Sequence, residues 1–292
     1  MSGAYAWILN LDAEHELEAR HHTPSPRGRV HADRALASLR GLVLPGDIVV
    51  PYEGGNVPLD ARGLKGLAWC PTPKAQERLL LAGAKLAPAP TVEVLRYVNH
   101  RAFCASLGQT LSGARFTREF AEVCELVRGP TSSGHWLLKR PLSFAGKGRR
   151  KVAQGALSDA DKAFVMASLE RHDGLQVEPF VERIKDIALH GYLAPSGALT
   201  LGDITEQDTD DSGAWQRTRV ASGLLVDAAD ALYAEAAQVA SALFRARYTG
   251  PFGIDAYLFR AGNELFFNAR SEINARFSMG WAIGMGARKP HR

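Results

Sequence analysis

The chain has 292 residues, of which 46% are hydrophobic and 23% are charged, and its formal net charge is +4 at pH 7. This balance is typical of a globular protein with enough apolar residues for one large domain or two smaller ones. No apolar run approaches the roughly 18 to 20 residues that a transmembrane helix needs, and the first residues lack the basic region of a secretory signal. We therefore predict a cytoplasmic protein that does not associate with membranes.

The three cysteines, Cys70, Cys104 and Cys124, lie far apart and form no C-x-x-C pair. This spacing predicts neither a zinc site nor a disulfide framework, which agrees with a reducing compartment. The densest basic run, KGRRK at 147–151, is compatible with a solvated surface, an anion site or a nucleic-acid contact. Because no helix or repeat extends this run as a basic stripe, we expect no nucleic-acid partner.

The N-terminal part of the chain alternates between strand and helix patterns. Strands are expected at 4–10, 46–50 and 66–70, and helices at 32–44 and 73–83. Strands that are separated by helices predict a small parallel α/β domain over residues 1–90. The segment LAPAP at 86–90 is the best candidate for a linker.

After this segment the pattern changes from helices to strands. Helices are expected at 91–108, where Thr91 is the N-cap, and at 117–127. From residue 131 onward we expect a hairpin with a glycine loop at 135–155 and a helix capped by Ser158 at 158–172. Four strands are expected next, at 175–182, 186–194, 198–206 and 215–221. A long alanine-rich helix at 228–247 and a final hairpin at 250–274 complete the prediction.

Polar residues alternate in the final hairpin. Glu272 and Asn274 share one face of the last strand, with Arg276 in line if the strand continues, and Asp255 lies opposite the apolar face of the preceding strand. Two antiparallel strands can therefore bring Asp255 near Glu272 and Asn274. Two carboxylates and an amide oxygen suit Mg²⁺, or Mn²⁺ in its place. Taken alone, the pattern is more typical of an edge hairpin with a solvated polar face.

Two lysines mark the earlier hairpin. Lys139 lies inside an apolar strand, where a buried ammonium needs an anionic partner. Lys147 lies between Gly146 and Gly148, and a glycine loop lets backbone N–H groups approach phosphate oxygens. The alternative is a flexible hairpin tip whose lysine contacts only water.

The strand at 175–182 offers a second kind of site. Glu178 and Phe180 share a face in a regular strand, and an exposed edge presents backbone groups to a flat heterocycle. Asp186 begins the next strand and could accept a hydrogen bond from a ribose hydroxyl. The alternative is a charged edge that prevents aggregation.

Two further positions remain open from the residues alone. Arg217 and Arg219 share a strand face, which is compatible either with a clamp on a substrate carboxylate or with two solvent-facing side chains. His190 faces the same way as Asp186 and Tyr192, and a structural role for this histidine is favoured over a contact with substrate.

In this order, the elements resemble the ATP-grasp superfamily of carboxylate–amine or thiol ligases, over roughly residues 92–285. The resemblance implies an α/β fold in which a pre-ATP-grasp-like α/β domain (1–90) precedes a two-subdomain ATP-grasp domain (91–292). The small lid subdomain would span about 131–180 and the metal-site subdomain about 181–285.

The resemblance also implies roles for single residues. Lys139 and Lys147 would contact the ATP phosphates, and residues 143–150 would order over them. Glu178, Phe180 and Val181 would bind adenine, and Asp186, with Glu182 as second choice, would bind the ribose. The implied metal ligands are Asp255, Glu272 and Asn274. Arg276 would face the transferring phosphate, with Lys147 and Arg219 as further catalytic residues.

One departure concerns the spacing of the metal ligands. Asp255 and Glu272 are 17 residues apart, whereas a spacing of about a dozen is common in this pattern. A shorter register would place Asn268 and Arg270 in the ligand positions. Because arginine cannot ligate a cation, we retain Glu272 and Asn274.

The function implied by the resemblance is an ATP-dependent ligase. The γ-phosphoryl group would pass to a substrate carboxylate, and an amine or similar nucleophile would attack the acyl phosphate. ATP, Mg²⁺ and a carboxylate-bearing small molecule or peptide are the expected partners, and a homodimer is left open. Two alternatives are a kinase-like phosphotransferase and a non-catalytic nucleotide-binding module, the second of which the intact Asp255, Glu272 and Asn274 disfavour.

Overall fold

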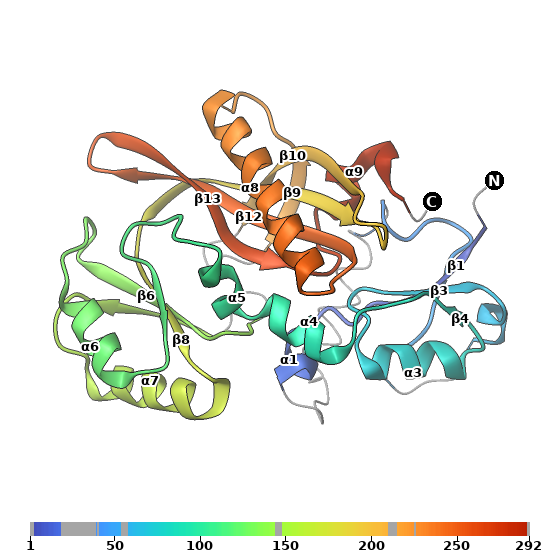
Figure 1. Ribbon diagram of the computed structural model, residues 1–292, viewed down its shortest axis with the longest axis horizontal. Coiled ribbons are helices and arrows are strands. Elements are labelled where there is room, and N and C mark those ends of the chain that lie inside the picture. Colours follow the sequence, from blue (N-terminus) through green and yellow to red (C-terminus); the bar gives the residue numbers. More distant parts are fainter. Residues whose placement is uncertain are drawn as a thin grey trace.

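The computed structural model describes residues 3–18, 39, 41–53, 58–143, 148–209, 215–224 and 226–290. Three sheets organise these residues (Figure 1): a parallel sheet near the N-terminus and two antiparallel sheets in the remainder of the chain. Within the described parts of the chain, no helix combines the length and apolar character that a membrane span requires.

The N-terminal sheet confirms the predicted parallel α/β arrangement. Its strands are ordered β2-β1-β3-β4 and all pair in parallel. The strands and helices of this part are β1 (Tyr5–Ile8), α1 (Ala13–Glu18), β2 (Ile48–Val49), η1 (Leu59–Ala61), β3 (Lys65–Ala68), α3 (Pro73–Leu81) and β4 (Lys85–Leu86). The two-residue β4 was not predicted, and most of the helix expected at 32–44 lies outside the described residues.

The single helix predicted at 91–108 is wrong. Two helices, α4 (Val92–Asn99) and α5 (Arg101–Ser106), are separated at His100, whose backbone is extended (φ −77°, ψ 136°). The His100 ring nitrogen Nδ1 accepts a hydrogen bond from the Ala102 N–H at 3.2 Å and so caps α5. This break turns Arg101 into the interior, where it is 7% exposed.

The second sheet has the order β5-β8-β6-β7 and is antiparallel. Its strands and helices are β5 (Arg115–Thr117), α6 (Phe120–Arg128), β6 (His135–Lys139), β7 (Arg149–Ala153), α7 (Asp159–His172) and β8 (Leu175–Pro179). The predicted hairpin is confirmed, since Lys139 pairs with Arg149, as is the Ser158 cap, which forms a capping box with Asp161. Residues 144–147 of the hairpin loop lie outside the described residues.

The third sheet has the order β11-β10-β9-β12-β13 and carries the predicted final hairpin. Its strands and helices are β9 (Glu182–Leu193), β10 (Leu199–Thr209), β11 (Trp215–Val220), α8 (Val226–Arg245), β12 (Gly250–Ala261), β13 (Glu264–Asn274), α9 (Trp281–Met285) and η2 (Gly286–Arg288). Helices α4 and α5 lie between the N-terminal sheet and the second sheet in Figure 1.

The two faces of the third sheet differ in chemistry. One face carries Ile187, Ile254 and Ile273, which belong to the same apolar cluster as Leu232 and Val239 of α8. Residues that are directly paired on neighbouring strands share a face. The opposite face therefore carries Asp255, Ala188 and Glu272, which are paired with one another across β9, β12 and β13.

Candidate functional site

Three polar side chains meet on the second of these faces. Asp255 of β12 is directly paired with Glu272 of β13, and Asn274 Nδ2 donates to Asp255 Oδ2 at 3.0 Å. Gln207 Nε2 of β10 lies 3.4 Å from Asp255 Oδ1. The arrangement expected of Asp255, Glu272 and Asn274 is thus present, and their role as metal ligands remains a prediction.

A bulge in β13 explains the long spacing between Asp255 and Glu272. From the turn to the Tyr257–Asn268 pair the two strands pair without interruption, and the same register continued would place Arg270 opposite Asp255. The register shifts between Asp255 and Tyr257, so that β13 contains two additional residues there and Glu272 faces Asp255 instead.

The displaced arginine has partners of its own. Arg270 is 4% exposed, and its Nε lies 2.9 Å from Glu235 Oε1 of α8. Its two terminal nitrogens donate to the Cys104 and Gly108 carbonyls at 2.7 and 2.6 Å. The bulge therefore removes a cation from the candidate metal position and uses it to fix α5 and α8 against β13.

The two carboxylates differ in their electrostatic surroundings. Burial and the charge of Glu272 raise the pKa of Asp255 to about 6, against the hydrogen bond from Asn274. Burial also acts to raise the pKa of Glu272, but the charges of Arg101 and Lys139 outweigh it, and this pKa is lowered. The nearby charges therefore raise the pKa of Asp255 on balance and lower that of Glu272.

The donor set fits a hard divalent cation. Two carboxylates and an amide match the oxygen ligands that Mg²⁺ prefers. Among the described residues no three His, Cys, Asp or Glu side chains are grouped as a metal site. The fit therefore depends on the Asn274 amide and on oxygens that a bound phosphate or water would add.

Lys139 forms the buried ion pair that its position in an apolar strand predicts. Its ammonium contacts the Glu178 carboxylate, and the two residues are 3% and 5% exposed. Burial lowers the pKa of Lys139 to about 8, although the charge of Glu178 opposes the shift. The pair lies on the face of the second sheet that also carries Gln176 and Arg149.

The residues after β8 have the polar contacts of a tight connection. The Phe180 N–H donates to the His135 carbonyl at 3.0 Å, and its own carbonyl accepts from Ser133 Oγ at 2.5 Å. The Phe180 backbone is therefore engaged within the sheet, and Lys151 Nζ lies 3.9 Å from the centre of its ring. Val181 follows, half-buried, between β8 and β9. Adenine binding by Glu178, Phe180 and Val181 stays a prediction.

Of the two ribose candidates, Asp186 lies nearer the acidic residues. It pairs with Tyr257, two residues from Asp255 on β12, whereas Glu182 pairs with Arg260 near the turn. The Asp186 carboxylate accepts from Arg183 Nη1 at 3.1 Å, and the Arg183 guanidinium lies 4.1 Å from the centre of the Tyr257 ring. Lys147 lies outside the described residues, so the structure gives no position for its side chain.

Arg276 is directed toward the N-terminal segment. Its Nε donates to Glu14 Oε1 of α1 at 2.6 Å, and its guanidinium lies 5.8 Å from the centre of the Trp69 ring. Glu14 is 5% exposed, and its second oxygen has no hydrogen-bond partner among the described residues. Contact between Arg276 and a phosphate remains a prediction, and it would require the guanidinium to leave or share Glu14.

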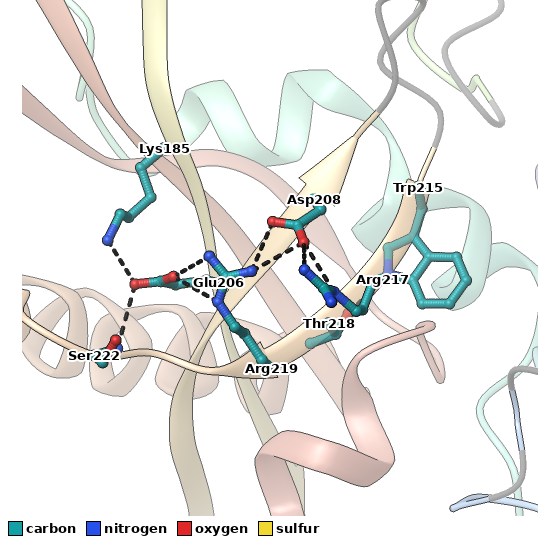
Figure 2. A network of polar contacts seen from close by, with 8 residues as sticks. All are labelled: Lys185, Glu206, Asp208, Trp215, Arg217, Thr218, Arg219 and Ser222. Carbon is teal, nitrogen blue, oxygen red and sulfur yellow. Dashed lines mark hydrogen bonds and ion pairs between the residues drawn. The ribbon is translucent and has the colours of Figure 1, made fainter.

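The expected catalytic role of Arg219 is not supported by its position. Arg219 pairs with Glu206 of β10, which pairs with Ile187 of β9, so all three lie on the face opposite Asp255. Its guanidinium binds the carboxylates of Glu206 and Asp208 at 3.0 and 2.9 Å (Figure 2). Arg219 therefore binds carboxylates, but these are the side chains of Glu206 and Asp208.

His190 has the buried structural environment that was favoured for it. The ring is 1% exposed, and burial lowers its pKa to about 4. Its nitrogens lie 3.1 Å from Ser278 Oγ and 3.4 Å from Thr205 Oγ1. A Cβ on Gly280 would lie 2.7 Å from His190 Nε2, so glycine is required for this close packing.

A pocket of about 560 Å³ lies beside Arg101 and Glu178. It lies between α5, the connection from α5 to β5, and strands β8 and β13, and it reaches Arg101, Glu178, Asn268 and Arg270. This volume is within the range of small-molecule sites. Arg101 was not predicted as a site residue, because a continuous helix over 91–108 gave no reason to turn its side chain inward.

Neither a family model nor a curated protein sequence matches this chain. Solved structures do match. D-alanyl-alanine synthetase A from Vibrio cholerae O1 is similar with a TM-score of 0.53 and 15% identity, covering 94% of this chain and 89% of that one. D-cycloserine synthetase gives 0.55 and 13%, covering 96% of each chain. N5-carboxyaminoimidazole synthetase from Staphylococcus aureus, solved with ADP, gives 0.53 and 14%, covering 94% and 71%.

These structures share the fold of this chain, which is the ATP-grasp fold. The mixed α/β architecture and the resemblance expected from the sequence are therefore confirmed. At identities of this size the similarity establishes the fold, and the activity has to be argued from the site.

Proposed function

We propose that this chain is an ATP-dependent ligase that joins a carboxylate to an amine or a similar nucleophile. The observation that carries the proposal is the bulge in β13. A two-residue shift places Glu272, and not Arg270, opposite Asp255, and so builds an oxygen-rich position on a sheet face that already carries Asn274 and Asp186. A solvated hairpin would have no need of a register shift that exchanges a cation for a carboxylate.

ATP would lie between the second and third sheets. Lys139, buried beside Glu178, supplies a positive charge for the phosphates, and Asp186 supplies an acceptor for a ribose hydroxyl. Asp255, Glu272 and Asn274 would hold Mg²⁺, or Mn²⁺ in its place, which when bound neutralises charge on the β- and γ-phosphates. The pocket is lined by Arg101 and Glu178, which form ion pairs with Glu272 and Lys139.

The chain's own residues would act by position and charge. The γ-phosphoryl group moves from ATP to an oxygen of the substrate carboxylate, and ADP leaves. The amine then attacks the acyl carbon, and inorganic phosphate leaves with the electron pair of the broken C–O bond. Lys139 orients the phosphates, while Asp255 and Glu272 keep the reacting groups in a fixed geometry. None of these steps needs a protein nucleophile.

The test is a screen for ADP release over pairs of carboxylates and amines, with mass spectrometry of the product. Amino acids are the first carboxylates to try, because two structural neighbours are D-alanyl-alanine and D-cycloserine synthetases. We expect a product that contains both partners and requires Mg²⁺. A phosphorylated product without an amine would identify a phosphotransferase, and ATP binding without turnover across the screen would identify a binding module. Glu272→Ala is the control that separates turnover by this site from a contaminating ATPase.

A further inference from the structure

Arg101, the first residue of α5, joins Glu272 to the base of the hairpin loop between β6 and β7. Its Nη2 donates to Glu272 Oε2 at 2.9 Å and to Ser143 Oγ at 3.2 Å. Its Nε donates to the Arg140 carbonyl at 3.0 Å, and its backbone N–H donates to the Pro141 carbonyl at 3.1 Å. One residue therefore contacts β13 and both ends of the segment 140–143, which we call the loop base.

This connection depends on the helix break at His100. An uninterrupted helix would carry Arg101 along the surface that α4 presents, whereas the separate start of α5 aims it inward. The guanidinium is 7% exposed and has a carboxylate, a hydroxyl and a carbonyl as partners. A buried guanidinium with this many directed bonds is fixed in one position.

The loop base also sets where the loop closes. The Arg140 N–H donates to the Gly148 carbonyl at 2.9 Å, next to the Lys139–Arg149 pair of β6 and β7. Gly148 has a φ of +70°, and a Cβ there would lie 3.3 Å from the Ser143 Cβ. Ser143 and Arg140 therefore pack closely against Gly148, which directly precedes Arg149 of β7.

Arg101 and a bound divalent cation would compete for the carboxylate of Glu272. Its carboxylate faces Asp255 on one side and the Arg101 guanidinium on the other. The Glu272 side chain is 32% exposed, so a partner from solution can reach it. The Arg101 guanidinium is positively charged, and so is a divalent cation bound by Asp255 and Glu272. Two cations that share the Glu272 carboxylate repel one another.

We propose that Arg101 is a positioning residue that couples the metal site to the loop base. Arg101 holds Glu272 and residues 140–143 together, and a divalent cation bound by Asp255 and Glu272 replaces the guanidinium as the partner of Glu272 and so releases the loop base. The inference rests on the metal site of the proposed function, and it adds a coupling that the site alone does not require.

The first experiment titrates Mn²⁺, without nucleotide, into the whole protein and follows the free ion by electron paramagnetic resonance. If the guanidinium competes, Arg101→Gln binds Mn²⁺ at least about fivefold more tightly than the wild type. Arg101→Lys, which keeps the charge, stays near the wild type. Arg217→Gln is the matched control, because it removes an arginine–carboxylate pair from the opposite face of the same sheet and leaves Mn²⁺ affinity unchanged.

The second experiment measures hydrogen exchange at Arg101 and at residues 140–143 and 148–150 with and without Mn²⁺. Mn²⁺ should speed exchange there in the wild type and have little effect in Arg101→Gln. Ser143→Ala, which removes one side-chain bond of the loop base, should weaken the exchange response and keep Mn²⁺ affinity within about twofold of the wild type, a small effect for one hydrogen bond outside the ligand set. This variant tests the coupling even if Arg101→Gln fails to fold.

The outcomes separate the coupling from the metal site itself. If Arg101→Gln binds Mn²⁺ equally or more weakly than the wild type, the guanidinium supports the ligand position and the coupling is refuted. Unchanged exchange at the loop base on Mn²⁺ binding refutes it as well. If Glu272→Gln binds Mn²⁺ as the wild type does, the metal site is wrong, and the proposed function loses its basis together with the coupling.

Discussion

The buried pair of Lys139 and Glu178 allows a quantitative test of how much the loss of one charged partner lowers the free energy of unfolding. Substitution Glu178→Gln leaves a lysine that is 3% exposed without its counter-charge. Breaking a buried pair by removing one partner costs roughly 3 to 5 kcal/mol. The pKa of Lys139, lowered from 10.5 to about 8 by burial even with Glu178 present, shows that the desolvation penalty is of this order, since each unit corresponds to about 1.4 kcal/mol.

The assay is urea unfolding at pH 7, followed by circular dichroism. Glu178→Gln should lower the free energy of unfolding by roughly 3 to 5 kcal/mol, and the double variant Lys139→Met/Glu178→Leu should recover most of the loss, because an apolar pair of similar size needs no desolvated charge. Both variants should lose ATP binding, since the phosphates lose Lys139 or its orientation.

The control is Glu122→Gln, the same substitution in the exposed pair with Arg115, where 64% of the arginine side chain is accessible. An exposed pair contributes less than about 1 kcal/mol. If Glu178→Gln costs no more than Glu122→Gln, or if the double variant is no more stable than Glu178→Gln, the claim that burial dominates this pair is refuted.

Three further predictions follow from the site and its surroundings. Glu272→Ala should reduce Mg²⁺-dependent ADP formation by at least about 100-fold with an unchanged circular dichroism spectrum, and turnover at the wild-type rate would exclude Glu272 as a ligand. Burial lowers the pKa of His190 to about 4, against 6.5 in the unfolded chain, so the histidine is neutral in the fold. The free energy of unfolding should therefore fall as the pH falls from about 6.5 to 4, by about 1.4 kcal/mol per pH unit. Urea unfolding at several pH values should show that His190→Gln lacks this dependence of stability on pH. An equal dependence in both proteins would contradict the assignment of the effect to His190. Arg219→Ala should leave ADP formation within about twofold of the wild type, because its guanidinium lies on the face opposite Asp255, whereas a loss comparable to that of Glu272→Ala would restore Arg219 to the active site.

Sequence patterns predicted the long elements of this fold and the residues that one hairpin brings together. The final hairpin, the helix capped by Ser158 and the parallel N-terminal sheet all carry local signals, namely alternation, capping residues and strand–helix order. Asp255 and Glu272 could be assigned to one site because they lie on adjacent strands of one hairpin and because arginine, which the register of the turn would place opposite Asp255, cannot ligate a cation. The short strands β4 and β5 escaped prediction because two or three residues show no period.

Features that depend on distant partners were not predictable. Whether Arg219 faces the site depends on which side of β10 and β11 helix α8 covers, and both sides of these strands carry charged residues. The break at His100 has no glycine or proline to signal it, and it is explained only by the inward bonds of Arg101. Arg276 and Glu14 are 262 residues apart, so their ion pair has no local signature. The two additional residues in β13 likewise resemble an ordinary strand until the pairing is seen.

The ring of Phe277 has a consequence for the history of this chain. It lies between Trp7 of β1 and Trp281 of α9, with ring centres 5.2 and 4.9 Å away, and its N–H donates to the Trp69 carbonyl at 3.1 Å. The strand that carries Glu272 and Asn274 thus runs directly into the aromatic interior of the N-terminal sheet. Recombination that replaced the first ninety residues with those of another enzyme would have to supply a matching cavity for Phe277 and a carboxylate for Arg276. Residues 1–90 and the segment that carries Arg276 and Phe277 are therefore expected to have evolved together, with changes near Trp7 and Glu14 restricted by these two distant residues.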